Sequence, residues 1–544
     1  MKRYLSNINK PAVWNSMLLA GTVLLGASSC TKNFERYNSD NTGVNTNLES
    51  LIRHEQRAIY NFSGGGDPNS FQLQQNLNAD CFSGYMMSAN PFGGNTNMNY
   101  ALVSGWNGEP FKVVYLDVLA YVAQMKQLKV DEQYPPVWAV AQITKITAMD
   151  RATDIYGPLP YSQAGGNKTG IPYDSQKDIY NSFFTELDEA VASLKSFISS
   201  GQKLPFDFGA IDLVYGGDFN RWLQFANSLR LRLAMHIVKV DAVTAKAQAD
   251  KALDPAAGGV ITANSGNMNI QIVGAGFDNP LVHIAQSWTD INIGASIQAY
   301  MSGYNDPRIG KYMDKSTDAL PALNGQYKGI RIGSTVLKND YVTYSTLNFK
   351  DGKTPSFNST TPVQIMTAAE VYFLRAEAAL RGWTSAGGTA QALYETGIQT
   401  SLDQWGVADA NYITDATSKP AAYADPKNAA NNSPALSDIT IKWEEGVTPE
   451  RKLERIMTQK WIAMFPEGQE AWTEFRRTGY PKLFPVVNNN SGGLIDSRIQ
   501  VRRLQYPQNE YNTNAAELNK GIQLLGGADN GGTRLWWDVN KGNF

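Results

Sequence analysis

Residues 218–236 read DFNRWLQFANSLRLRLAMH, and this stretch decides the fold class. Asp218 is a favourable N-cap, because its carboxylate can accept a hydrogen bond from an unpaired backbone N–H of the first helical turn. The residues of one helical face then follow at intervals of three or four: Trp222, Phe225, Leu229, Leu233 and His236. Such spacing is typical of an amphipathic α-helix that packs one face against a core.

Two stretches before this one predict helices by the same reasoning. The first begins near Pro136, which suits a first helical turn, and runs to about Asp150. The second has Asp174 as its expected N-cap. Its apolar stripe recurs at the same intervals: Ile179, Phe183, Leu187, Val191 and Leu194. Both patterns favour helices of several turns.

Two later stretches add to the helical content. Residues 367–381 carry an apolar face, and Gly382 is a stop signal after it. Thr448 and Pro449 open the last strong helix, which Pro466 ends because proline cannot continue a helix. We therefore expect a mainly α fold of tetratricopeptide-like helical hairpins with long loops and a few short strands, although no strict 34-residue repeat is present.

The remaining stretches are richer in turn signals. Residues 303–358 contain short alternating runs such as Val342-Thr343-Tyr344, so we expect irregular loops and a few strands there. Residues 408–440 are rich in Ala, Asn, Asp and Pro. Because helical signal resumes on both sides, we interpret them as a long surface excursion rather than a linker between domains.

The amino-terminal residues are typical of an export signal. Lys2 and Arg3 give a positive start, and the apolar run over residues 17–27 is shorter than the roughly 20 residues needed to span a bilayer. The small residues Ala27-Ser28-Ser29 then precede Cys30, as lipoprotein signal peptidase requires. Cleavage after Ser29 without attachment of lipid is the alternative.

These features predict the domain organisation. We expect a signal peptide over residues 1–29, lipidation at Cys30, a tether over residues 30–47 and a single helical domain over residues 48–544. A bacterial lipid anchor carries several acyl chains and would hold the protein durably at a membrane.

Composition excludes several classes of function. A net charge of −2 over 544 residues, with no run of Lys and Arg, gives no field that would attract nucleic acid. Apart from Cys30 the chain has one cysteine, Cys81, so no internal disulfide is expected. The hydrophobic fraction of 42% is ordinary for a packed globular protein.

No motif in the sequence indicates catalysis. The three histidines, His54, His236 and His283, are not paired at metal-ligand spacing, and His236 belongs to the apolar helical face. We therefore predict a protein that is not an enzyme and has no cofactor. Oxygen-rich loops leave a structural Ca²⁺ open, but no EF-hand spacing supports one.

Several blocks along the chain resemble the SusD/RagB family of nutrient-binding outer-membrane lipoproteins, in its SusD-like branch. Their number, order and spacing make the resemblance specific. In chain order they are Cys30-Thr31-Lys32-Asn33-Phe34-Glu35, Asp154-Ile155-Tyr156-Gly157-Pro158-Leu159-Pro160-Tyr161, Tyr173-Asp174-Ser175-Gln176, Asp212-Leu213-Val214-Tyr215-Gly216-Gly217-Asp218, Asn305-Asp306-Pro307-Arg308, Glu370-Val371-Tyr372-Phe373-Leu374-Arg375-Ala376-Glu377-Ala378, Gln459-Lys460-Trp461-Ile462 and Glu470-Ala471-Trp472-Thr473-Glu474-Phe475-Arg476-Arg477.

The resemblance implies a fold built on tetratricopeptide-like hairpins and a place at the surface of the outer membrane. It also implies a partner, a SusC-type TonB-dependent transporter, to which the protein delivers a captured oligosaccharide. Capture of a peptide and a pure assembly role without a nutrient ligand remain as alternatives. The shared arginines, such as Arg232, are expected to pair with carboxylates such as Glu370 and Glu377, and Asp306-Pro307-Arg308 is expected to be a turn.

A ligand site is expected where loops mix aromatic rings with amides, because a sugar ring has one apolar face and a polar rim. Residues 78–107 fit best, and a second cluster runs from His283 to Asn292. The candidate contacts are Trp106, Tyr100, Phe92 and Asn99, followed by Trp288 and Asp290. The alternative is that these aromatic side chains pin a long loop onto the body.

Overall fold

The computed structural model describes residues 48–60, 68–165, 170–272, 278–350 and 355–544. Residues 51–544 form one compact unit. The expected signal peptide over residues 1–29, the lipidation site Cys30 and the tether over residues 30–47 lie outside the described residues. Among the described helices, none combines the length and the apolar character needed to cross a bilayer.

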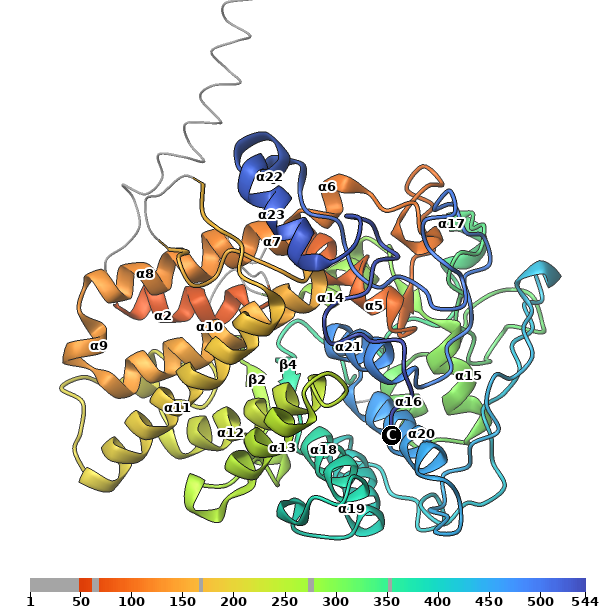
Figure 1. Cartoon of the computed structure of the whole chain (residues 1–544). Helices are drawn as coiled ribbons and strands as arrows, with labels where there is room; N and C mark the ends of the chain where they lie inside the picture. The colour runs from red at the N-terminus through yellow and green to blue at the C-terminus, as the bar shows by residue number, and fades with distance from the viewer. Residues whose placement is uncertain (1–47, 61–67, 166–169, 273–277, 351–354) are drawn as a thin grey trace, which may run out of the picture. The chain divides into compact units, whose positions relative to one another are not determined.

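Helices dominate the described chain (Figure 1). The longer ones are α2 Leu48–Ala58, α8 Ala120–Gln127, α10 Pro135–Tyr156, α11 Gln176–Ser200, α12 Phe219–His236, α13 Ala242–Leu253, α15 Ala295–Gly303, α18 Ala368–Leu380, α19 Ala390–Gln404, α20 Pro449–Met464, α21 Gly468–Thr478 and α23 Ala515–Leu525. Shorter ones are α4 Pro68–Phe71, α5 Ala79–Phe82, α6 Ser104–Asn107, α7 Glu109–Val113, α9 Val130–Gln133, α14 Pro280–Val282, α16 Ile309–Tyr312, α17 Lys338–Tyr341 and α22 Gln508–Thr513.

Consecutive helices pack as hairpins: α10 with α11, α12 with α13, and α18 with α19. The hairpins also contact one another, because α11 packs on α12 and α12 packs on α18. In Figure 1 the helices α10 to α13 lie on one side of the view, and α15 to α17 lie on the opposite side. The mainly α fold of tetratricopeptide-like hairpins with long loops is therefore confirmed.

Helix starts follow the expected capping chemistry with one exception. Asp218 caps α12 by accepting hydrogen bonds from the backbone N–H groups of Asn220 and Arg221. The predicted N-cap Asp174 is wrong, because Ser175 caps α11 by accepting from the N–H of Asp178. The Asp174 carboxylate instead accepts hydrogen bonds from the backbone of Tyr161 and Ser162 and so holds the preceding turn.

The strands are few and very short. β1 (Met86–Met87) pairs antiparallel with β3 (Asn292–Ile293), and β2 (Met268–Ile270) pairs antiparallel with β4 (Val363–Met366). The strand expected at Val342-Thr343-Tyr344 is wrong, because these residues form a turn after α17. The hydroxyls of Tyr341 and Tyr344 both bond the carboxylate of Asp425, which draws the turn onto the body.

The long excursion over residues 408–440 forms the predicted surface segment. It contains turns, one short 3₁₀ helix (Ala429–Asn431) and an isolated bridge between Tyr423 and Ser433. Two buried tyrosines, Tyr412 and Tyr423, attach it to the body. The tyrosine anchors explain how so polar a segment stays ordered without secondary structure of its own.

Buried ion pairs join the central helices. Arg232 on α12 makes two hydrogen bonds of 2.8 and 2.7 Å to the carboxylate of Glu370 on α18, as the sequence predicted. Glu377 on α18 pairs instead with Arg477 on α21 and Arg381, the residue that follows α18. Because buried charges are stable only when paired, these contacts fix which helices can be neighbours.

A second part of this network surrounds His236, which is fully buried at the end of α12. Its Nε2 lies 3.1 Å from Glu470 Oε1, and its Nδ1 lies 3.4 Å from Asp154 Oδ2. Burial lowers the pKa of His236, but Glu470, Asp154 and Asp150 outweigh burial and raise it to about 9. Lys460 lies 3.6–4.0 Å from three of the carboxylates of the network, those of Glu370, Glu470 and Glu474. His236 is therefore a charged member of a buried ionic cluster.

The turn expected at Asp306-Pro307-Arg308 is confirmed, and it carries a further buried pair. Arg308 Nη2 lies 2.7 Å from Asp306 Oδ2, and both side chains are fully buried. The same guanidinium donates to Ser401 on α19 and to the hydroxyl of Tyr412. The pair thus attaches the excursion over residues 408–440 to the helices.

We expect Arg232→Met to lower the free energy of unfolding by about 3–5 kcal/mol, because it leaves the Glu370 carboxylate buried without its main partner. The double variant Arg232→Met/Glu370→Met should recover much of that loss. Urea unfolding followed by circular dichroism measures both. The matched control is Lys246→Ala, which removes a half-exposed pair with Asp250 and should cost less than about 0.5 kcal/mol. Equal losses for the two single variants would contradict the role of the buried pair.

We also expect the free energy of unfolding to fall in alkaline solution, because His236 loses its proton. A histidine of ordinary pKa 6.5 in the unfolded chain and about 9 in the folded protein contributes stability that is complete below pH 6.5. This contribution is lost as the pH rises through 9. Urea unfolding at several pH values should show this decline in the wild type and a flatter dependence in His236→Gln. Parallel curves for the two proteins would contradict the assignment.

Candidate ligand-binding site

The pairing of β1 with β3 brings together the two segments in which ligand contacts were predicted. Met86 faces Ile293 and Met87 faces Asn292 in the antiparallel register. The chain that leaves β1 runs through residues 88–103 into the short helix α6, which carries Trp106, and the chain that enters β3 contains Trp288 and Asp290. Segments separated by roughly 200 residues thus share one side of the body.

Asp290 is the centre of the contacts between these segments. Its carboxylate accepts hydrogen bonds from Asn90 Nδ2 at 2.9 Å and from Gln72 Nε2 at 3.4 Å. Lys338 Nζ lies 3.0 Å from Asp290 Oδ1 and also donates to the backbone oxygen of Trp288 at 2.8 Å. Asp290 is only 9% exposed. Its carboxylate therefore positions the loops, and a ligand would reach its neighbours more readily than Asp290 itself.

Two aromatic pairs lie on this side of the body. Phe92 and Trp106 meet edge to face, with ring centroids 5.4 Å apart. Trp288 meets the ring of His283 in the same way at 4.9 Å. All four side chains are half-buried, so each pair supports a ring that still has an accessible surface.

The backbone is strained beside both pairs. Phe92 has a φ of 44° and Thr289 has a φ of 52°, in the left-handed region that L-residues rarely adopt. For the β-branched Thr289 this conformation costs on the order of 1–3 kcal/mol. The hydrogen bonds of the Asp290 carboxylate and of the Trp288 backbone oxygen hold the strained turn from both sides of Thr289.

The ring of Tyr100, which we expected to be exposed, is buried. It is 1% exposed, because it ends a 3₁₀ turn (Asn97–Asn99) with a φ of 65° that directs its side chain inward. Its hydroxyl has no hydrogen-bond partner among the described residues. Asn99 is half-buried and accepts a hydrogen bond from the backbone of Thr96 while donating to that of Gly94. Tyr100 thus pins the loop to the body, as the alternative interpretation proposed.

A polar cavity of about 290 Å³ adjoins this loop. Asn90 and Asn99 line one part of it, and residues that sequence reasoning missed line the rest: Gly333, Ser334, Thr335, Val336, Asn488 and Asn490. Asn490 joins the two parts, because its backbone N–H donates to Asn99 O at 2.8 Å. The run of three asparagines at residues 488–490 was the available signal, since it repeats the amide-rich character of residues 90–99.

We define the candidate site by its two half-buried tryptophans, Trp106 and Trp288, with Phe92, Lys338 and the polar cavity. The half-buried indole rings offer apolar faces, and the amides of Asn90, Asn99, Asn488 and Asn490 line the cavity. Elsewhere, buried His236 lies with Asp150 and Asp154, and with Glu470 and Glu474, at distances that could suit a metal. Arg232 and Lys460 already balance those carboxylates, so the cluster is explained as ionic.

Comparison with known proteins identifies the fold family. The family described as SusD-like, SusD and RagB outer-membrane lipoproteins, matches residues 30–538. A search of curated proteins finds no match.

Several solved structures resemble the chain over nearly its whole length. A chitin-binding SusD homologue from Flavobacterium johnsoniae is 42% identical with a TM-score of 0.85, and the match covers 91% of this chain and 99% of that one. A SusD homologue from Bacteroides vulgatus is 39% identical with a TM-score of 0.84, covering 91% and 98%. One from Bacteroides uniformis is 36% identical with a TM-score of 0.82, covering 91% and 99%.

The homologue from Flavobacterium johnsoniae is described as chitin-binding. The family match, the identity to solved homologues and the hairpin fold agree with one another. The chain therefore belongs to the SusD-like family of SusD and RagB outer-membrane lipoproteins.

Proposed function

We propose that this protein captures an oligosaccharide at the cell surface and delivers it to a SusC-type TonB-dependent transporter. The observation that carries the proposal is the presence of two half-buried tryptophans, Trp106 and Trp288, on segments that Asp290 holds together. Flat rings with fixed orientation bind the apolar face of a sugar at low entropic cost.

The chitin-binding relative from Flavobacterium johnsoniae supports a ligand that contains N-acetylated sugars. The polar cavity suits such a sugar, because it combines amides with the apolar side chains of Met87, Met98 and Val336. An acetamido group needs both, a hydrogen-bond partner for its amide and an apolar contact for its methyl group. We therefore propose a chitin-type oligosaccharide as the ligand.

Attachment through lipid at Cys30 completes the proposal. The family match begins at this residue, and the small residues before it suit a lipoprotein signal peptidase. With its amino end in the outer membrane, the helical body would face the medium, where it could close over the mouth of a transporter. The alternative ligand for the same scaffold is a peptide.

We expect Trp288→Ala and Trp106→Ala each to weaken binding of soluble chitin by about tenfold or more, because each removes a stacking surface. Affinity electrophoresis in gels with and without glycol chitin measures the change. The matched control is Trp138→Ala, which removes a half-buried tryptophan on the scaffold helix α10. If glycol chitin retards both site variants as much as the wild type, the proposed site is wrong. If the protein binds peptides and no sugar, the proposed ligand is wrong.

Lipid attachment has its own test. Cys30→Ser should abolish incorporation of labelled palmitate and should move the protein from the membrane fraction to the soluble fraction. Cys81→Ser is the control, because Cys81 is a buried free thiol and cannot carry the anchor. A Cys30→Ser protein that still incorporates the label would contradict the assignment of the lipidated residue.

A further inference from the structure

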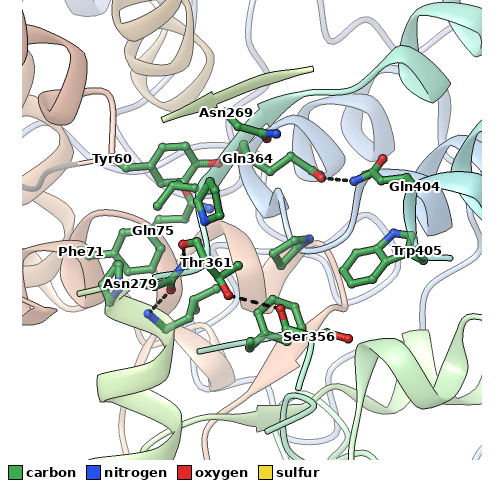
Figure 2. A pocket seen from close by; sticks show the side chains of 16 residues that line it. Tyr60, Phe71, Gln75, Asn269, Asn279, Ser356, Thr361, Gln364, Gln404 and Trp405 are labelled. Atoms are coloured by element: carbon green, nitrogen blue, oxygen red, sulfur yellow. Dashed lines mark hydrogen bonds between the residues drawn. The ribbon is translucent and has the colours of Figure 1, made fainter. Parts of the chain in front are cut away.

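A second cavity, of about 180 Å³, shares no lining residue with the polar cavity of the candidate site. It lies between β4, the end of α19 and the region of α4 and α14 (Figure 2). Figure 2 shows Tyr60 and Phe71 on one side of it and Gln404 and Trp405 on the opposite side. Its other edges are closed by the segments that contain Asn269 and Ser356.

Aromatic rings form the opposed walls of this cavity. Tyr60 and Phe71 stack with centroids 5.7 Å apart, and Phe357 and Trp405 meet with centroids 6.1 Å apart. Trp405 is half-buried, whereas Phe71 and Phe357 are buried. A flat molecule with an apolar face would therefore find a ring on either side.

Most of the amides around the cavity are already engaged with the protein. Gln364 donates to Met464 O at 2.9 Å and accepts from Gln404 Nε2 at 2.7 Å. Asn279 donates to Thr361 O at 2.8 Å. These bonds make the walls rigid, so the cavity has a defined shape.

Three polar groups remain available. Among the described residues, the Oε1 atom of Gln404 is buried without a hydrogen-bond partner. Asn269 and Ser356 line the same cavity, and their half-buried side chains make no side-chain hydrogen bond to any described residue. A buried unpaired acceptor costs about 1–3 kcal/mol, which a bound hydroxyl group would recover.

The described residues that line the cavity are all uncharged. Behind its wall, Glu467 accepts from the Tyr60 hydroxyl and pairs with Arg151. A charged ligand would lose its hydration here without finding a partner. The volume corresponds to about six water molecules, which is the room of one small ring rather than a chain.

We propose that this cavity binds a single neutral hexose ring, separately from the capture of oligosaccharide at Trp106 and Trp288. The sugar stacks between the aromatic walls, and its hydroxyls bond to Gln404, Asn269 and Ser356. The two sites are close along the chain, because α14 lines this cavity and leads through His283 to Trp288. They are nevertheless distinct in lining and in charge, so each can be removed alone.

The test uses the whole mature protein with D-glucose and D-galactose as probes, measured by saturation-transfer NMR and isothermal titration calorimetry. Ser356→Trp fills the cavity and should abolish saturable binding of both probes while leaving retardation by glycol chitin unchanged. Ser199→Trp, an exposed serine on α11, is the matched control and should bind as the wild type does. Trp288→Ala should retain monosaccharide binding and lose retardation.

A second variant keeps the test decisive if Ser356→Trp does not fold. Gln404→Met preserves the side-chain volume, removes the unpaired oxygen and should weaken monosaccharide binding by about tenfold. The proposal is overturned if the wild type binds neither probe, if Ser356→Trp or Gln404→Met binds as the wild type does, or if glucuronate binds as tightly as glucose. Loss of monosaccharide binding in Trp288→Ala would assign the sugar to the candidate site instead.

Discussion

The pairing of buried charges is the constraint on which the arrangement of the helices depends. Arg232 and Glu370 join α12 to α18, while Arg477 and Glu377 join α21 to α18, with all four side chains at most 3% exposed. Hydrophobic contacts are tolerant of small shifts, but a buried guanidinium without its carboxylate is not. The helices therefore pack in one register, and the loops that carry the candidate site start from fixed positions.

Much of this fold could be predicted from the sequence, because helical periodicity and capping are local properties. Asp218 and Thr448 cap the helices that the sequence assigns to them. The prediction that Asp174 caps α11 was wrong because the neighbouring Ser175 can also cap the helix. The choice depends on the turn at Tyr161, whose backbone N–H donates to the Asp174 carboxylate. The strands were mislocated because each is at most four residues long and depends on a partner far away in the chain.

The candidate site was predictable as a region but not residue by residue. Composition pointed to Trp106 and Trp288, and the pairing of β1 with β3 places their segments together. Composition could not show that Tyr100 turns inward, since that depends on a backbone conformation in the left-handed region. Composition also could not predict that residues 333–336 and 488–490 belong to the site. They reach it only through tertiary contacts such as that of Asn490 with Asn99.

The two residue pairs between β1 and β3 lie at the boundary between the helical scaffold and the segments of the candidate site. Beyond it the chain carries Trp106, Phe92 and Trp288, none of which belongs to the ionic cluster that orders the helices. Substitutions in these segments can change the candidate site while the helical scaffold still assembles. After a gene duplication, one copy could therefore diverge at the candidate site while the buried ionic cluster of its helices is inherited unchanged.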